Sequence, residues 1–120
     1  MKVLKRNNKL RYLHYFEERF LNELIEKIKV SYPLIKKIIL YGSKARGDFT
    51  EESDIDLLFI TEKPLDKQEK YEIFNFLSEI ELKYNIVASA LFINEKELKK
   101  KERSLFREIK KDGITLWLRE

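Results

Sequence analysis

The chain has 120 residues, with 25 Lys and Arg against 21 Asp and Glu, and therefore a formal charge of +4. Apolar residues make up 43% and charged residues 38%, which is enough to fill a core but too polar for a membrane protein or a collagen-like fibre. The absence of cysteine excludes a disulfide framework, a thiolate zinc site and a cysteine nucleophile, and the single His14 cannot form a His-rich metal site. With no apolar run of signal-peptide or transmembrane length, we expect one cytoplasmic domain over residues 1–120.

The first predicted elements are a helix and a buried strand. An apolar stripe at steps of three and four predicts a helix that runs to about Val30 and ends before Pro33; the stripe consists of Leu13, Phe16, Phe20, Leu24 and Ile28. Residues 34–41 form a run rich in Ile and Leu that ends at Gly42. Such a run is typical of a buried strand that leads into a turn.

The middle of the chain continues the alternation. Residues 55–60 are apolar on both faces after Asp56, which predicts an inner strand covered by helices. Residues 66–83 then keep helical spacing, with Asp66 as the N-cap. The apolar face of this second helix is predicted to contain Tyr71, Phe74, Leu77 and Ile80.

The last part of the chain completes the sheet. Residues 86–93 predict a third strand, and residues 94–111 predict a helix that is broken near Ser104. Gly113 fits the position just past the end of that helix. Residues 114–118 can then add a short final strand. This order of elements predicts an α/β or α+β fold, a sheet with helices laid on it.

The segment after the first strand, residues 42–47, reads Gly-Ser-Lys-Ala-Arg-Gly. A strand that turns here into a short helix presents free N–H groups that attract anions. Gly42 permits a close backbone approach, and Ser43 adds a hydroxyl donor. Lys44 or Arg46 can neutralise phosphate oxygens. The segment alone is commonly just a turn, but with a second half-site it predicts phosphate binding.

The second half-site is the pair Asp54 and Asp56 at the start of the inner strand. Side chains alternate along a strand, so the two carboxylates point to one face, with their Cα atoms about 6.5–7 Å apart. Mg²⁺ prefers such carboxylates together with phosphate oxygens and water. The pair could arise by chance, but next to a phosphate-binding turn it indicates nucleotidyl transfer, in which metal ions steady the attacking and leaving oxygens at phosphorus.

Residues 42–47 and 53–57 together resemble the G-S-x₁₀-D-x-D signature of the DNA polymerase β-like nucleotidyltransferase superfamily, specifically the minimal nucleotidyltransferases (MNT). The resemblance implies a mixed central sheet flanked by helices, ATP or another nucleoside triphosphate as the donor, and Mg²⁺ bound by Asp54 and Asp56. It also implies a partner. Small members are often encoded beside a helical HEPN protein, and in such toxin–antitoxin pairs the MNT protein can neutralise the toxin by transferring AMP to a tyrosine.

One feature departs from the family pattern. Active members usually carry a third carboxylate on a later strand, but no Asp or Glu occurs between Leu82 and Asn94. Ser89 offers only a neutral oxygen there. Glu79 and Glu81 fall on the preceding helix, where we expect them to face solvent. These residues leave open an alternative, a catalytically weak or inactive nucleotide-binding antitoxin or regulatory subunit.

The main hypothesis is therefore Mg²⁺-dependent transfer of a nucleoside monophosphate, most simply AMP, to a hydroxyl of a protein or small molecule. Because the catalytic core nearly consumes the chain, we expect a partner protein or a homo-oligomer to support the acceptor. The aromatic residues of the first helix could serve that contact or fill the core, and include Tyr12, Phe16 and Phe20. Nucleic-acid binding rests only on Lys99–Lys101 and is disfavoured, since a solvated helix face explains that run. His14 is expected to be structural.

Overall fold

The computed structural model describes residues 13–48, 53–100 and 104–120, so Tyr12 and Lys101 lie outside the described residues. Each predicted helix and strand is present with its ends shifted by only a few residues. The elements are α1 (Tyr15–Ser31), β1 (Ile35–Tyr41), α2 (Ser43–Arg46), β2 (Ile55–Thr61), α3 (Lys67–Tyr84), β3 (Ala88–Asn94), α4 (Glu95–Lys100), α5 (Ser104–Asp112) and β4 (Ile114–Leu118). In these three stretches, no helix has the length and apolar character needed to cross a membrane.

The four strands form one mixed sheet in the order β3-β2-β1-β4. β1 runs antiparallel to both β2 and β4, whereas β2 and β3 are parallel. The predicted mixed sheet with flanking helices is thereby confirmed, and β2 is an inner strand as expected. In the register, Asp56 on β2 lies opposite Tyr41 on β1 and Ser89 on β3.

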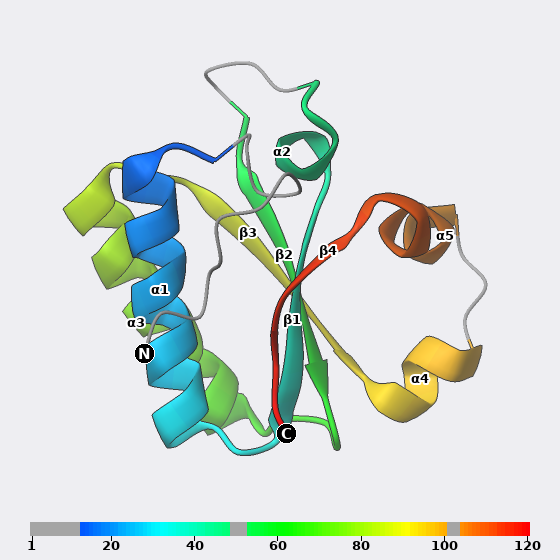
Figure 1. Cartoon of the computed structure of the whole chain (residues 1–120). Coiled ribbons are helices and arrows are strands. Elements are labelled where there is room, and N and C mark those ends of the chain that lie inside the picture. The colour runs from blue at the N-terminus through cyan, green and yellow to red at the C-terminus, as the bar shows by residue number, and fades with distance from the viewer. Residues whose placement is uncertain (1–12, 49–52, 101–103) are drawn as a thin grey trace.

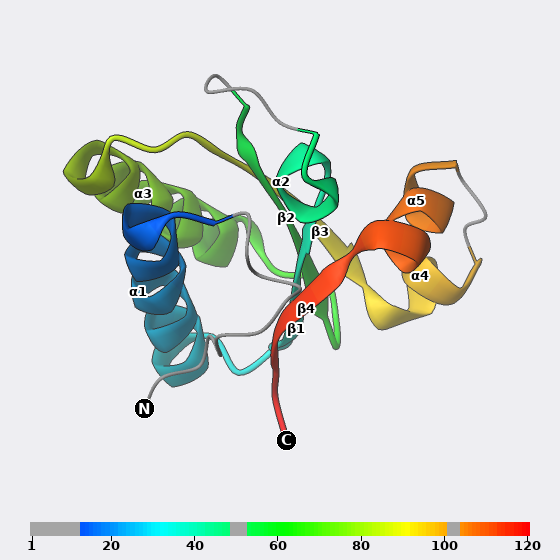
Figure 2. The ribbon, with the colours of Figure 1, turned by 45° about the horizontal axis from the view of Figure 1, so that its top comes forward.

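Helices cover the two faces of the sheet differently. α1 and α3 lie together on one face, and α4 and α5 lie on the other (Figure 1, Figure 2). Alternation along β2 sends Leu57 and Phe59 into the main core under α1 and α3, whereas Leu58 and Ile60 pack with Ile109 of α5. Asp56 shares the orientation of Leu58 and Ile60, so it lies on the α4–α5 face.

The buried faces of the two long helices, α1 and α3, differ from the predicted apolar faces at a few positions. Phe16 is 56% exposed, because the buried stripe of α1 is centred on Leu21 and Leu24 and its first turn faces inward at Glu17 and Glu18. In α3 the buried positions are Ile73, Leu77 and Ile80. The predictions that Tyr71 and Phe74 belong to the buried face are therefore wrong, since they are 63% and 44% exposed.

The ends of the helices follow the sequence signals more closely. Asp66 caps α3 as predicted, accepting a hydrogen bond from the backbone N–H of Glu69. Gly113 follows α5, and a Cβ there would lie 2.3 Å from the carbonyl oxygen of Ile109. Only glycine fits this close backbone approach, which brings the chain from α5 directly into β4.

Candidate active site

The turn between β1 and β2 is built on two glycines. Gly42 has φ +76° and ψ −159°, a region that is essentially restricted to glycine, and it precedes the single helical turn of α2. Its carbonyl accepts the N–H groups of Ala45 and Arg46, each at 3.1 Å. Gly47 ends the turn in the left-handed region, with φ +94°. The predicted short helix after Gly42 is thus present.

Gly42 also brings the two predicted half-sites into contact. A Cβ on Gly42 would lie only 2.2 Å from Oδ2 of Asp56. The carboxylate of Asp56 therefore packs directly against the backbone where the predicted phosphate-binding turn begins. Contact of this kind allows a single ligand to touch both the turn and the carboxylate.

Asp54 lies beside β3 on the same side. The hydroxyl of Ser89 donates a hydrogen bond to Oδ2 of Asp54 at 3.2 Å, while Ser89 is also the register partner of Asp56. Ser89 therefore occupies the place on the neighbouring strand where the family pattern expects a third carboxylate. The structure puts a neutral hydroxyl next to the acidic pair.

The two glutamates of α3 lie on the helix that covers the opposite face of the sheet. Glu79 is exposed, as predicted. The prediction for Glu81 is wrong, because its side chain is half-buried and Oε2 accepts the backbone N–H of Ala88 at 2.9 Å. Glu81 fastens the start of β3, so neither glutamate supplies the missing third carboxylate at the site.

The electrostatics of the site favour a bound cation. Burial raises the pKa of Asp56, the negative charge of Asp54 raises it further, and Arg46 partly opposes both effects. Burial and the charge of Asp56 likewise raise the pKa of the Tyr41 hydroxyl. Both shifts come first from burial and second from a neighbouring carboxylate, and a bound metal ion would relieve the second effect.

The two predicted phosphate-binding cations are placed differently. The guanidinium of Arg46 is exposed and pairs with Asp48, at 3.1 Å between Nε and Oδ2. It lies close enough to Asp56 to affect its pKa. Lys44 is instead buried, with its ammonium 2.9 Å from Oε2 of Glu17 and both side chains no more than 7% exposed. This pairing favours a role for Lys44 in holding α2 against α1 rather than in binding phosphate.

Glu17 is a structural residue that the sequence analysis did not single out. Its Oε1 accepts the backbone N–H of His14 at 3.1 Å, and the Nδ1 atom of His14 accepts the N–H of Glu17. The two residues form a capping box at the start of α1, which confirms that His14 is structural. The signal was the spacing of His14 and Glu17, but histidine replaces the usual Ser or Thr of that motif.

Removing Lys44 should therefore destabilise the fold. We expect Lys44→Ala to lower the free energy of unfolding by about 3–5 kcal/mol, because it leaves the buried carboxylate of Glu17 without its ion partner. Urea denaturation measures the effect. Lys83→Ala is the matched control, since it breaks the exposed pair with Glu23 and should change stability far less. Equal losses in the two variants would contradict the structural role of Lys44.

The donor set at this edge of the sheet fits Mg²⁺. Across the described stretches of the chain, no group of three or more His, Cys, Asp or Glu side chains could form a closed metal cage. Mg²⁺ does not need one, because it is usually held by one or two carboxylates together with substrate phosphates and water. The predicted pair Asp54 and Asp56 fits this donor set, since the carboxylate of Asp56 lies against Gly42 at the start of the turn.

The sequence of this chain is similar to a known domain family and to curated proteins. A family model described as "Nucleotidyltransferase domain" matches residues 18–113. A Methanocaldococcus jannaschii protein named "Putative protein adenylyltransferase" is 37% identical over 103 residues, which cover 84% of this chain and 98% of the relative.

Two solved structures share the fold. A chain in the crystal structure of a toxin–antitoxin with AMP-PNP matches with a TM-score of 0.60 and 20% identity, over 82% of this chain and 73% of that chain. A structure of a tri-AMPylated Shewanella oneidensis HEPN toxin in complex with MNT antitoxin matches with a TM-score of 0.54 and 17% identity, over 83% of this chain and 71% of that chain.

Proposed function

Since the chain belongs to the nucleotidyltransferase domain family, as a minimal nucleotidyltransferase, we propose that it transfers AMP from ATP to a hydroxyl group of a protein and requires Mg²⁺. The observation that carries this proposal is the packing of the Asp56 carboxylate against Gly42. The packing supports the proposal because a ligand of Asp56 and a ligand of the turn would meet at one point, as transfer at the α-phosphorus requires.

Each site residue has a distinct part in this proposal. Asp54 and Asp56 hold the metal, and bound Mg²⁺ would offset the negative charge of the triphosphate during the displacement. The hydroxyl of Ser43 donates a hydrogen bond to the phosphates of the leaving group. The close approach at Gly42 lets the backbone N–H groups of the turn donate hydrogen bonds to the same phosphates. Arg46 adds a cation that is exposed and close to Asp56.

The relatives support a protein as the acceptor. The Methanocaldococcus jannaschii relative is named as a protein adenylyltransferase, and the Shewanella oneidensis neighbour is an MNT antitoxin bound to a tri-AMPylated HEPN toxin. We extend that arrangement to this chain and assign it a helical HEPN-type partner as the AMP acceptor.

The proposal is tested with ATP labelled at the α-phosphate. The purified chain, Mg²⁺ and the product of the neighbouring gene are incubated together, and label is followed on the partner by gel electrophoresis and mass spectrometry. We expect one or more AMP groups on the partner and none after chelation of Mg²⁺ with EDTA. Label at the γ-phosphate should not transfer. An unlabelled partner under all conditions would contradict AMP transfer.

A second candidate function rests on Ser89. Because a neutral hydroxyl stands where the family pattern expects a third carboxylate, the site has less charge with which to hold a metal and no third carboxylate as a base for the acceptor hydroxyl. A regulatory subunit that binds ATP without turnover would have these properties. Calorimetry would then show binding of ATP and Mg²⁺ without pyrophosphate release, and an Asp54→Ala variant would still neutralise the partner.

A further inference from the structure

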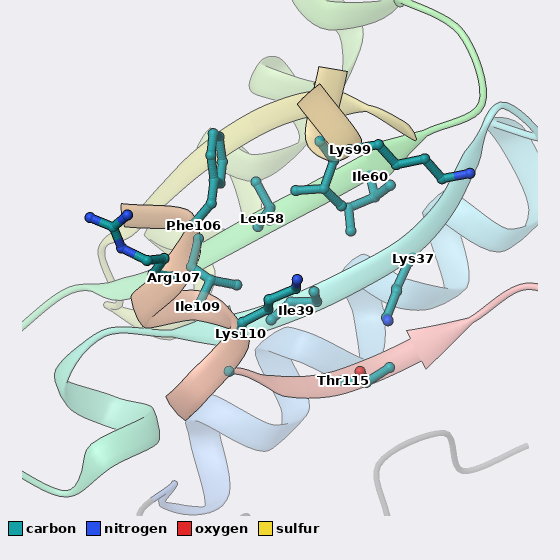
Figure 3. A pocket seen from close by; sticks show the side chains of 12 residues that line it. Lys37, Ile39, Leu58, Ile60, Lys99, Phe106, Arg107, Ile109, Lys110 and Thr115 are labelled. Atoms are coloured by element: carbon teal, nitrogen blue, oxygen red, sulfur yellow. The ribbon is translucent and has the colours of Figure 1, made fainter. Parts of the chain in front are cut away.

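A groove of about 720 Å³ lies between the sheet and the α4–α5 pair (Figure 3). Its floor is apolar and comes from the inner strands, with Ile39 of β1 and both Leu58 and Ile60 of β2. Phe106 and Ile109 of α5 form an apolar wall. The volume is in the range of about 300–1,000 Å³ that is usual for ligand sites.

The groove lies on the same face of the sheet as Asp56. Asp56, Leu58 and Ile60 alternate with the core residues of β2 and so share one face of the sheet. Leu58, which is fully buried beneath the groove, is two residues from Asp56, a Cα separation of about 7 Å. A side chain bound in the groove can therefore reach toward the carboxylates.

The groove and the phosphate-binding turn lie on opposite sides of the carboxylates. α2 lies over the end of the sheet where β1 finishes and β2 begins, while α4 and α5 flank the sheet farther along β2 (Figure 1). In an in-line displacement the attacking and leaving oxygens stand on opposite sides of phosphorus. With pyrophosphate at the turn, an acceptor oxygen that comes from the groove would stand opposite the leaving group, as in-line displacement requires.

The rim of the groove carries four cationic side chains from three elements. Lys37 lies on β1, Lys99 on α4, and Arg107 and Lys110 on α5, arranged around the apolar floor (Figure 3). Among the lining residues in the described part of the chain, none is acidic. This combination complements a ligand that has apolar side chains and several negative charges.

The positive charge of the rim distinguishes between two candidate ligands of the groove, the nucleoside of ATP and a polypeptide segment. Adenine and ribose carry no negative charge, and the triphosphate is already assigned to the turn at Gly42. A polypeptide segment with Asp and Glu residues around an apolar or aromatic side chain matches both rim and floor. We propose that the groove binds an acidic segment of the acceptor protein and directs its hydroxyl to the site at Asp54 and Asp56. This inference rests on the proposed function.

The test uses short fluorescein-labelled peptides with one central tyrosine, flanked by Glu, by Gln or by Lys. Fluorescence anisotropy without ATP measures binding to the full chain. We expect the Glu-flanked peptide to bind most tightly. In a Lys99→Glu/Lys110→Glu variant its affinity should fall about tenfold, because two rim attractions become repulsions. Equal binding of the three peptides would overturn the inference.

A matched control separates the groove from net charge. Lys100→Glu/Lys111→Glu changes the charge by the same amount on the same two helices, but these exposed side chains do not line the groove. Its affinity for the Glu-flanked peptide should stay within about twofold of the unmodified chain, allowing for weak long-range attraction. A loss as large as that of the groove variant would reject a specific acidic site.

Two further measurements distinguish a peptide ligand of the groove from the nucleotide, and the groove proposal from the proposed function. The affinity for AMP-PNP with Mg²⁺ should be the same in the groove variant, and a tenfold loss would assign the groove to the nucleoside and overturn the inference. Addition of labelled ATP then tests AMP transfer to the bound peptide. Selective binding of the Glu-flanked peptide with no transfer to any acceptor would reject the proposed function and still support the acidic docking groove.

Discussion

Replacing Asp56 by asparagine should lower AMP transfer by about 10²–10³-fold, since the variant loses one of the two charged metal ligands of the proposed site and with it several kcal/mol of transition-state stabilisation. The side chain keeps its shape, so it should still fit against Gly42. Initial rates with labelled ATP at saturating Mg²⁺ measure the effect. Glu79→Gln removes an equal charge from the exposed face of α3 and should leave the rate unchanged.

The same substitution should make the Mg²⁺-free protein more stable at neutral pH. Burial and Asp54 raise the pKa of Asp56 in the folded chain, so the folded state binds this proton more tightly than the unfolded state. Stability therefore falls as pH rises through that pKa, and asparagine removes the loss. Thermal melts in EDTA should give Asp56→Asn a higher melting temperature than the unmodified chain at about pH 7. The difference should vanish at about pH 3, where Asp56 is protonated in both the folded and the unfolded state. A lower melting temperature at neutral pH would contradict the electrostatic account.

Much of the fold was predictable because its signals are local. The apolar runs of β1 and β2 and the helical spacing of α1 and α3 each depend on near neighbours in the chain. Alternation along a strand also predicted that Asp54 and Asp56 share a face, which agrees with the charge of Asp54 adding to the effect of burial on the pKa of Asp56. Their function as metal ligands remains a prediction.

The contacts that could not be predicted join distant parts of the chain. The burial of Lys44 depends on Glu17, which α1 presents from another layer of the fold, and no local pattern distinguishes such a lysine from one that binds phosphate. The groove is a similar case, because its floor and rim come from β1, β2, α4 and α5 together. Lys99 and Lys110 read separately as solvated helix residues, and only the folded arrangement shows that both face one apolar floor.

Gly42→Ala should reduce AMP transfer by about a hundredfold or more while leaving the chain folded. The new Cβ would lie 2.2 Å from Oδ2 of Asp56, so that carboxylate must move by roughly 1 Å, a displacement that can cost about 10² in rate at a reacting centre. Because the atom that moves ends a short side chain, the steric part of the stability loss is small. The glycine-only backbone at φ +76° adds about 1–3 kcal/mol of strain.

A Gly47→Ala variant separates the backbone strain caused by Gly42→Ala from its displacement of the Asp56 carboxylate. Gly47 also has a positive φ, +94°, at the other end of α2, so alanine there strains the same turn, by about 1–2 kcal/mol. Urea denaturation and transfer rates are measured side by side in the two variants. We expect broadly similar losses of stability but a much larger loss of rate at Gly42, because that position alone sets the distance between the turn and Asp56. Equal losses of rate would mean that backbone strain, rather than the position of the Asp56 carboxylate, governs the site.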